Sequence, residues 1–430
     1  MKVFFDSIGC RLNQSEIEKY ASQFRAAGHE IVRDAADADL VVVNTCAVTA
    51  EAASDSRQKI RQASRAGSAQ VIVTGCWSTL EPQQALSLPG VTQVIPNLDK
   101  DRLVAEVLGL PIEVFDLEPV AREPLPGAHL RTRAFIKVQD GCDNHCTFCI
   151  TRVARGAGRS RSVEQVLADI RAALRGGAQE IVFTGVHLGS WGQDFAQPHH
   201  LRHLIETALR ETDAPRLRLS SLEPWDLDED FFSLWQDARL CRHLHLPLQS
   251  GCEATLRRMA RKVTPESFAR LVETARAAAP DMAVTTDVIV GFPGETPAEF
   301  AQSLAFVEVM HFAAGHVFNY SARPGTPAAR LPLQVPPPVR KARSAEMRAV
   351  LGTASQQYRR AFLGSTQDVL WEAVTPEGAA GFHLEGLTGN YLRVAASAAD
   401  ARWNQINSVR LTGLTADGMT GEIIEEPVHD

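Results

Sequence analysis

The stretch AFIKVQDGCDNHCTFC, residues 134–149, opens the part of the chain that decides its fold. Its first half, 134–139, has the apolar residues of a buried strand, and three cysteines follow it directly. Further strand-like runs come after helical patterns, namely EIVFTG (180–185), RLRLSS (216–221), HLHLPLQ (243–249), AVTTDVIVG (283–291) and HVFNYS (316–321). Alternating strands and helices predict a parallel barrel or partial barrel with its chemistry on the loops that follow the strands.

A second α/β unit is expected upstream of this barrel. The short apolar runs are VFF (3–5), LVVVNT (40–45) and VIVTG (71–75), which are typical of strands buried on both faces. Ser15 and Glu18 fit a capping box at the start of a helix. We therefore expect a small parallel sheet covered by helices over residues 1–113.

The chain changes character after the barrel, which we expect to span residues 129–363. LPLQVPPPVR (331–340) predicts a stiff linker or the start of a helix running to about residue 363. The runs that follow are QDVLWEAV (367–374), NYLRVAA (390–396), NSVRLTGL (407–414) and GEII (421–424). Because Gly-containing turns separate them, they predict a small all-β barrel over 364–430.

Composition and charge limit the classes of function. The 430 residues are 45% hydrophobic and 22% charged, which excludes a disordered or fibrous protein. No run of 18 apolar residues and no signal-peptide pattern occurs, so we expect a cytoplasmic protein without a membrane span. The net charge is −7, and residues 364–430 hold 3 Arg against 10 Asp and Glu. Residues 131–161 instead carry 7 Lys and Arg against 2 Asp, which indicates either an RNA-binding patch or an ordinary solvated surface.

Cys142, Cys146 and Cys149 carry the strongest chemical signal, a C-x3-C-x2-C spacing. Cysteine thiolates ligate iron–sulfur clusters, and three of them leave one iron of a four-iron cube open. The amine and carboxylate of S-adenosylmethionine can chelate that iron, and one electron then cleaves the sulfonium to a 5′-deoxyadenosyl radical. The alternative is a structural zinc site with His145, although zinc knuckles usually show C-x2-C pairs.

Three more cysteines, Cys10, Cys46 and Cys76, each follow a predicted strand of the N-terminal sheet. The carboxyl ends of parallel strands share one edge, where ligands bind in open α/β folds, so these side chains can converge. The alternative is that they are buried apolar cysteines. Cys241 and Cys252 match no ligand motif and are expected to be structural.

Motifs throughout the chain resemble the radical S-adenosylmethionine methylthiotransferase family. They are IGCRLNQSE (8–16), VVNTCAVT (42–49), VTGCW (73–77), QDGCDNHCTFCITRVARGAGRSR (139–161), LPLQSG (246–251) and TDVIVGFPGET (286–296). GLTGNYLRV (386–394) resembles the RNA-binding TRAM domain. The resemblance covers the three predicted domains in the family's order. It implies two 4Fe-4S clusters, S-adenosylmethionine, a tRNA substrate and an electron donor such as flavodoxin or ferredoxin.

The resemblance also implies roles for individual residues. Cys142, Cys146 and Cys149 would hold the radical cluster, and the N-terminal trio the auxiliary cluster. The expected S-adenosylmethionine contacts are Phe148 and Gly291 at the adenine, Gly185 at the methionine amine, and Ser221 and Glu223 at the ribose or carboxylate. The basic stretch supplies Arg155, Arg159 and Arg161 as expected phosphate contacts, which position an RNA without reading its sequence.

RVARGAGRSR (152–161) and EIVFTGVHLGSWG (180–192) most resemble the branch that acts on threonylcarbamoyladenosine in tRNA. In this family a methylthio group replaces a hydrogen of the substrate. The carboxylate of threonylcarbamoyladenosine needs a cationic or donor-rich pocket, for which the candidates are Arg152, Arg155, Arg159, His187 and Arg323. The alternatives are isopentenyladenosine in tRNA, an aspartate of a ribosomal protein, or a non-catalytic iron–sulfur or zinc protein that binds RNA.

Overall fold

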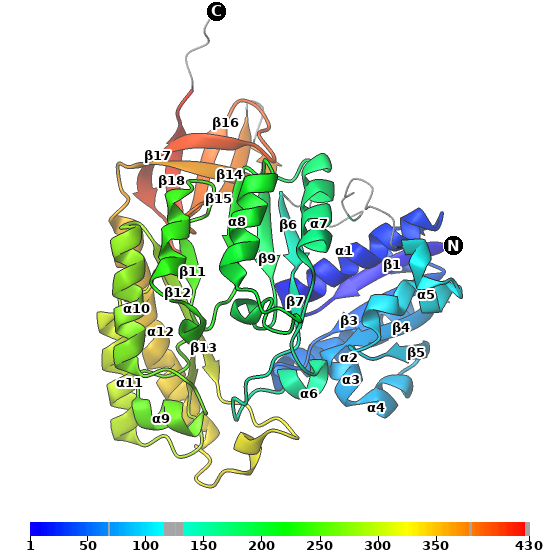
Figure 1. Ribbon diagram of the computed structural model, residues 1–430, viewed down its shortest axis with the longest axis horizontal. Coiled ribbons are helices and arrows are strands. Elements are labelled where there is room, and N and C mark those ends of the chain that lie inside the picture. The colour runs from blue at the N-terminus through cyan, green and yellow to red at the C-terminus, as the bar shows by residue number, and fades with distance from the viewer. Residues whose placement is uncertain (68, 116–124, 126–131, 378–380, 426–430) are drawn as a thin grey trace, which may run out of the picture.

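The computed structural model describes residues 1–67, 69–115, 125, 132–377 and 381–425. An N-terminal sheet unit (blue in Figure 1), a large partial barrel (green to yellow) and a C-terminal β barrel (orange to red) make up the molecule. The expected start of the central unit at residue 129 lies outside the described residues. Among the helices of the described ranges, none is both long and apolar enough to cross a membrane.

The N-terminal unit is a five-stranded parallel sheet in the order β2-β1-β3-β4-β5. Its strands are β1 (Lys2–Ser7), β2 (Glu30–Ile31), β3 (Leu40–Thr45), β4 (Gln70–Gly75) and β5 (Val91–Ile95). Its α-helices are α1 (Arg11–Ala26), α2 (Ala50–Ala66), α3 (Cys76–Leu80), α4 (Pro82–Leu86) and α5 (Leu103–Leu108). The three expected strands are confirmed, and β3 is buried along its whole length. Sequence reasoning missed β2 and β5 at the two edges.

The expected helix start at Ser15 is wrong. The helix α1 begins at Arg11, with Cys10 in the extended conformation as its N-cap. Ser15 lies inside the helix, and its Oγ accepts a hydrogen bond from the backbone N–H of Lys137 at 3.2 Å. The hydroxyl therefore joins the N-terminal unit to the central barrel instead of capping a helix.

The central unit contains the six expected strands in consecutive parallel order. They are β6 (Arg133–Lys137), β9 (Glu180–Thr184), β10 (Arg216–Leu219), β11 (His243–His245), β12 (Ala283–Val290) and β13 (Ala314–Asn319). Isolated bridges from Leu217 to Leu240 and from Ser221 to His245 connect the two three-stranded halves. Within the described ranges no pairing joins β13 to β6, so the fold is a partial barrel.

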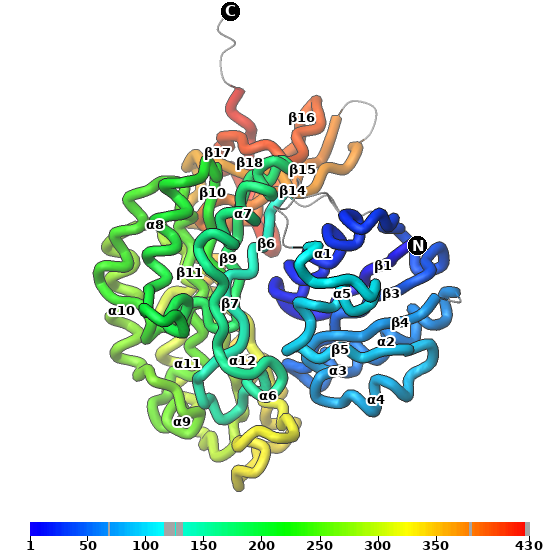
Figure 2. The backbone as a smooth tube through the Cα atoms, turned by 45° about the vertical axis from the view of Figure 1, so that its right-hand side comes forward, coloured from blue at the N-terminus to red at the C-terminus, as the bar shows by residue number. Residues whose placement is uncertain are grey.

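Helices cover the outside of this partial barrel (Figures 1 and 2). They are α7 (Val163–Arg175), α8 (Leu201–Glu211), α9 (Glu253–Arg258), α10 (Pro265–Ala278), α11 (Pro297–Val309) and α12 (Pro337–Arg360). Ser162 and Gln165 form the expected capping box of α7. Inward-facing side chains of the helices and outward-facing side chains of the strands, such as Leu217 and Leu219, share one large apolar core. The alternate residues of each strand consequently face the lumen.

The C-terminal unit is a closed five-stranded barrel in the order β14-β15-β16-β18-β17. Its strands are β14 (Thr366–Pro376), β15 (Phe382–Thr388), β16 (Arg393–Ala398), β17 (Ile406–Leu414) and β18 (Met419–Ile423). Only β15 was not expected. The barrel sits at the amino ends of the central strands, where Arg216 and Arg218, on β10, donate to its backbone carbonyls. It therefore lies at the opposite end of the central unit from the cysteine loop (Figure 1).

Candidate iron–sulfur site

The N-terminal cysteines stand at the carboxyl ends of three neighbouring strands. Cys10 closes the loop after β1, Cys46 directly follows β3, and Cys76 opens α3 after β4. Because β1, β3 and β4 are adjacent and parallel, all three cysteines lie at one edge of the sheet, as the sequence predicts. Gly9 has φ +111°, and a Cβ atom there would come within 2.9 Å of the Cys46 sulfur.

Asn13 ties this edge together. Its Nδ2 donates to the carbonyl of Ile8 at 2.7 Å and to that of Thr45 at 3.2 Å. Its Oδ1 accepts a hydrogen bond from the Cys10 thiol at 3.8 Å. The loop that carries Cys10 is thereby held against the end of β3, where Cys46 follows.

The second trio lies on the loop between β7 (Gln139–Asp140) and α6 (Thr151–Arg155). Gly141 has φ +73°, and a Cβ atom there would stand 1.9 Å from the carbonyl oxygen of Ala157, so only glycine fits this turn. The backbone N–H of Cys142 donates to the carbonyl of Gly156 at 3.1 Å. The loop therefore folds back on itself, with Cys142 held against the end of α6.

Donors surround the sulfurs of this second trio. The N–H of Asn144 points at the Cys142 sulfur and that of Thr151 at the Cys149 sulfur, both at 3.4 Å. Arg261 donates from Nη1 to the Cys146 sulfur at 3.8 Å, and its Nη2 lies 2.7 Å from a carboxylate oxygen of Glu223. Such a shell of N–H groups stabilises negative charge on sulfur.

The free thiols themselves are poor anions in this environment. Burial raises the pKa of the Cys46 thiol and that of the Cys146 thiol to about 11 each, and Arg261 offsets this only in part at Cys146. Desolvation by the surrounding protein also raises the pKa of the Cys10 thiol. The residue as a whole is nevertheless exposed to solvent. A bound metal would supply the positive charge that thiolates need here.

The residues present fit iron–sulfur clusters. All eight cysteines are free, and the two trios combine thiol ligands with N–H and guanidinium donors, the surroundings that cluster sulfurs take. In the part of the chain that the structure describes, no group of three His, Cys, Asp or Glu side chains gathers around the position of a single metal ion.

His187 and Asp226 form a further pair beside the second trio, 2.6 Å apart. Desolvation lowers the pKa of His187, but hydrogen bonds to Asp226 and Cys142 outweigh it and raise the pKa to about 10. The carboxylate of Asp226, from the neighbouring strand-end loop, therefore holds the imidazole beside Cys142 and favours its protonated form.

The expected S-adenosylmethionine contacts surround the second trio to different degrees. Phe148 is half-buried and packs edge-on against Phe292 with ring centroids 6.4 Å apart. Glu223 is engaged by Arg261, while Ser221 is exposed. A methyl group at Gly185 would touch the Gln139 side chain at 3.2 Å.

Gly291 has φ +70°, and the Arg340 side chain lies over it, where a Cβ atom would come within 2.2 Å of Arg340 Cγ. Its N–H donates to Glu295 at 2.7 Å. The space expected for adenine at this glycine is thus covered by Arg340, and an adenine there requires that side chain to move.

The three arginines expected to contact phosphate differ in their exposure to solvent, and the prediction for one of them is wrong. Arg155 is only 2% exposed, and its guanidinium is directed into the protein, so it cannot meet a phosphate. Arg161 donates to Asp169 at 2.5 Å and to the carbonyl of Lys137. Arg159 keeps 42% of its side chain exposed and is the one of the three that faces solvent.

Several residues of the site were missed by sequence reasoning. They are Asn13, Glu16, Asn97, Lys100 and Arg261. Asn13 and Glu16 fall within the motif at 8–16, which was a usable signal. Asn97 donates to the Cys76 sulfur at 3.7 Å and to the carbonyl of Ala154 at 2.8 Å, but no spacing pattern marks it in the sequence.

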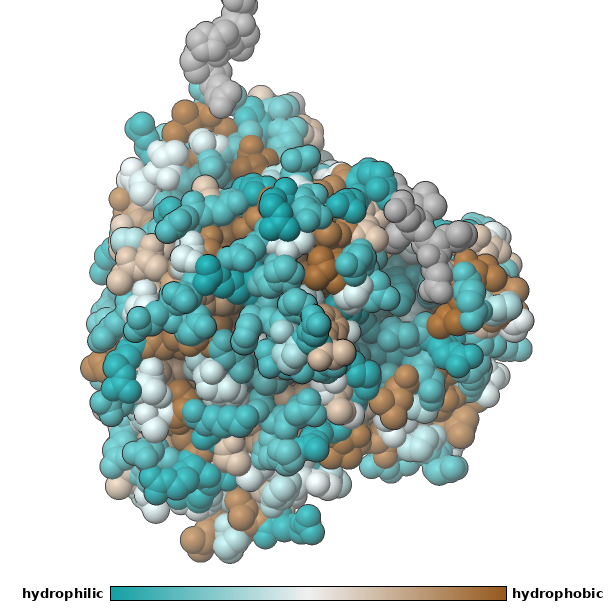
Figure 3. Space-filling view, in the orientation of Figure 1, coloured by the Kyte–Doolittle hydropathy of each residue, from teal (hydrophilic) through white to brown (hydrophobic). Residues whose placement is uncertain are grey.

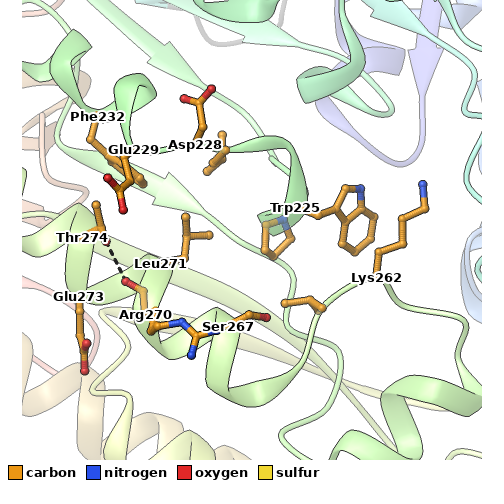
Figure 4. Close-up of a pocket in the computed structure, with 13 residues that line it drawn as sticks. Trp225, Asp228, Glu229, Phe232, Lys262, Ser267, Arg270, Leu271, Glu273 and Thr274 are labelled. Carbon is orange, nitrogen blue, oxygen red and sulfur yellow. Dashed lines mark hydrogen bonds between the residues drawn. The ribbon is translucent and has the colours of Figure 1, made fainter.

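A separate cavity of about 680 Å³ lies between the loop after β10 and helix α10 (Figure 4). Trp225 and Lys262 stand at one end, and Glu229 and Thr274 at the other. No cysteine lines it. Figure 3 shows another hollow in the surface, between the N-terminal unit and the central partial barrel.

The comparisons with known proteins agree with this architecture. Residues 136–307 match the Radical SAM superfamily, and residues 2–96 match a family described as Uncharacterized protein family UPF0004. The solved structure of TsrM from Kitasatospora setae, a radical S-adenosylmethionine methyltransferase with cobalamin and a [4Fe-4S] cluster bound, aligns with a TM-score of 0.58. It covers 76% of both chains at 16% identity, so it shows the shared fold alone.

The partial barrel and its C-x3-C-x2-C loop define a radical S-adenosylmethionine enzyme. Two curated relatives, each named threonylcarbamoyladenosine tRNA methylthiotransferase MtaB, are 35% identical to this chain. The one from Bacillus subtilis covers 95% of this chain and 93% of its own length, and the one from Thermotoga maritima 97% and 96%. A tRNA-2-methylthio-N6-dimethylallyladenosine synthase from Novosphingobium aromaticivorans is 35% identical over 85% of each chain. The chain belongs to the radical S-adenosylmethionine methylthiotransferase family.

Proposed function

We propose that this enzyme methylthiolates carbon 2 of N6-threonylcarbamoyladenosine at position 37 of tRNA. S-adenosylmethionine serves both as methyl donor and as radical source, and two 4Fe-4S clusters take part. The observation that carries the proposal is that Arg155, which ends the helix after the Cys142, Cys146 and Cys149 loop, contacts the Cys76 sulfur of the N-terminal unit at 3.3 Å. Full-length relatives that act on this nucleoside support it.

The roles proposed for the cysteines are those that the family resemblance implies. Cys142, Cys146 and Cys149 would hold the cluster that binds S-adenosylmethionine and supplies the electron for its cleavage, and the N-terminal trio the cluster that delivers the methylthio group. Arg261 places a positive charge beside Cys146, and His187 lies beside Cys142. The hollow between the units would exclude bulk water from the reacting carbon, and the fixed spacing of the trios would position both reactants.

Arg323 is the best-placed partner for the carboxylate of the threonylcarbamoyl group. Its Nε is buried and has no hydrogen-bond partner. Burial lowers the pKa of its guanidinium; the nearby Cys46 thiol acts in the opposite direction, and Arg57 adds to the lowering. A carboxylate bound here would supply the missing acceptor and offset the burial of the charge. Isopentenyl, which is wholly apolar, would leave Arg323 unpaired.

The nucleoside is tested with purified enzyme and matched tRNAs that carry either threonylcarbamoyladenosine or isopentenyladenosine. Turnover of the first alone is expected, and Arg323→Gln should slow it about tenfold or more, because a charged hydrogen bond is lost. Arg330→Gln, an exposed arginine nearby, is the control. Turnover of the isopentenyl tRNA alone, or of a ribosomal protein, would overturn the substrate but not the family.

The two clusters are tested by substitution. Changing Cys142, Cys146 and Cys149 to Ala should remove about half of the iron and sulfide from anaerobically reconstituted protein. Cys10→Ala should keep the reductive cleavage of S-adenosylmethionine but abolish methylthiolation. Methylthiolated product at the wild-type yield from Cys10→Ala would contradict the division of labour between the trios. The electron donor, a flavodoxin or ferredoxin, remains a prediction of the family resemblance.

A further inference from the structure

Arg155 is the last residue of α6, six positions after Cys149, and it is directed into the N-terminal unit. Its Nε donates to the Cys76 sulfur at 3.3 Å, and its Nη2 donates to Asn13 Oδ1 at 2.8 Å. Asn13 is the amide that also receives the Cys10 thiol. One guanidinium, from the helix after the second trio, therefore contacts Cys76 of the first trio directly and is linked to Cys10 through Asn13.

The same guanidinium also bridges two buried carboxylates. Nη1 lies 3.0 Å from Glu16 Oε1, in α1, and 2.9 Å from Asp140 Oδ1, which precedes the cysteine loop. Lys100 forms ion pairs with both carboxylates from the N-terminal side. Arg155 and Lys100 lower the pKa of Glu16 to about 2 against the desolvation that raises it, so the carboxylate is ionised. These two cations and two anions are the buried centre of a wider network, in which Lys137 also lies 3.8 Å from Asp140 and Asn44 donates to Glu16 at 2.8 Å.

We propose that Arg155 is a positioning residue that fixes the distance between the two clusters and tunes the reduction potential of the auxiliary cluster through the Cys76 sulfur. This inference rests on the proposed cluster at Cys10, Cys46 and Cys76. Arg155 can fill this role because the three nitrogens of its planar guanidinium donate hydrogen bonds to acceptors in several directions at once. Lysine places its donors on one atom and cannot reach all four partners.

The effect on potential has a defined sign. A hydrogen bond and a positive charge at a ligating sulfur stabilise the reduced, more negative cluster, so they raise its potential. Loss of Arg155 should therefore lower the midpoint potential of the auxiliary cluster. Arg155→Lys keeps the positive charge but loses the planar set of donors. The midpoint potential should therefore stay near that of the parent, while the interface between the units is loosened.

The experiment begins from the full chain carrying Cys142→Ala, Cys146→Ala and Cys149→Ala, reconstituted anaerobically, so that only the auxiliary cluster remains. Iron and sulfide are measured first, because absence of a cluster from this protein would overturn the two-cluster part of the proposed function. Arg155→Gln and Arg155→Lys are then added, and the midpoint potential is followed by electron paramagnetic resonance. The expected result is a lower potential in Arg155→Gln and a value near the parent in Arg155→Lys.

Arg218→Gln is the matched control, because Arg218 is also a buried arginine paired with a carboxylate but touches none of the six cysteines. It should leave the potential unchanged. A loaded Arg155→Gln protein with the parent's potential would overturn the assignment, as would equal loss of iron from Arg155→Gln and Arg218→Gln. Selective loss of iron from Arg155→Gln, restored in Arg155→Lys, would support it.

Discussion

Two interfaces hold the units of this enzyme together, and buried arginines are central to both. Toward the N-terminal sheet, Arg155 donates to side chains, namely the Glu16 carboxylate, the Asn13 amide and the Cys76 sulfur, and it also meets Asp140 of its own unit. Toward the C-terminal barrel, Arg216 and Arg218 donate to backbone carbonyls of the barrel, while Glu180 of the central unit holds Arg218. The first interface contains the cysteines, and the second lies at the other end of the strands.

The two interfaces differ in the kind of acceptor that their arginines meet. Carbonyl acceptors are present in every sequence, so the C-terminal interface depends on its arginines and on the shape of the barrel. The side-chain acceptors around Arg155 depend on a particular set of residues at the sulfur ligands. We infer that the C-terminal contact fixes the barrel in place, whereas the N-terminal contact also sets the geometry and charge of the reaction site.

The stretch GLTGNYLRV (386–394) lies at the C-terminal interface. Tyr391 stacks on His243 with ring centroids 4.1 Å apart, lies 5.5 Å from Arg218, and accepts a hydrogen bond from Arg11. Asn390 is buried beside it. The motif that suggests an RNA-binding domain in the sequence thus lies, in this fold, at the contact between the C-terminal barrel and the other two units.

The largest effect is expected at the C-terminal interface. Arg218 and Glu180 are both 0% exposed, and Arg218→Gln would leave the Glu180 carboxylate buried without its cation. Removal of one partner of a buried ion pair costs about 3–5 kcal/mol, so the variant should lose that much free energy of unfolding in urea. Arg242→Gln, which breaks a partly exposed pair with Asp281, should cost less than about 1 kcal/mol. Equal losses in the two variants would refute the importance of the buried pair.

The two interfaces should also respond differently to mild acid. Desolvation, followed by the nearby Arg218, holds the pKa of His243 well below its ordinary value of 6.5. The unfolded chain therefore takes up a proton below pH 6.5 that the folded chain refuses, so this contribution to stability is complete above pH 6.5 and falls below it. Between pH 6.5 and 5.5 the loss should be about 1 kcal/mol.

His243→Phe keeps an aromatic ring against Tyr391 but cannot titrate, so urea unfolding should show a flatter pH dependence than in the wild type. His316→Phe, which removes an exposed histidine, should keep the wild-type slope. Glu16, at the other interface, has its pKa lowered to about 2 and stays ionised throughout this range. A slope unchanged in His243→Phe would show that the histidine is not held neutral by the fold.

Sequence reasoning predicted much of the fold because its signals are local. Strand runs such as 40–45 and the capping box at Ser162 and Gln165 report on neighbouring residues, and both were found in place. The edge strand β2 is too short to carry an apolar pattern. The burial of Arg155 was not predictable, because its partners Glu16 and Asn13 are distant in the chain and charge counting treats every arginine as solvent-facing.

This correction changes how RNA binding should be tested. Arg155 and Arg161 are engaged within the protein, which leaves Arg159 as the exposed arginine of the expected three. Deletion of residues 364–430 would uncover Arg218 and Glu180 and confound binding with unfolding. Surface substitutions on each unit are therefore the sharper comparison.

The smallest effect is expected at single phosphate contacts. Arg159→Gln should weaken tRNA binding and reduce the slope of log affinity against log salt by roughly 0.7 to 0.9, the value of one contact. Arg161→Gln, whose guanidinium already meets Asp169, should change the slope less. On the acidic C-terminal barrel the exposed pair Arg393 and Arg410, changed together to Gln, should also have the smaller effect, because the surrounding carboxylates repel phosphate. If that double change flattened the slope more than Arg159→Gln, the C-terminal barrel would be the main holder of RNA, and the basic stretch after the second trio would serve the cysteine site alone.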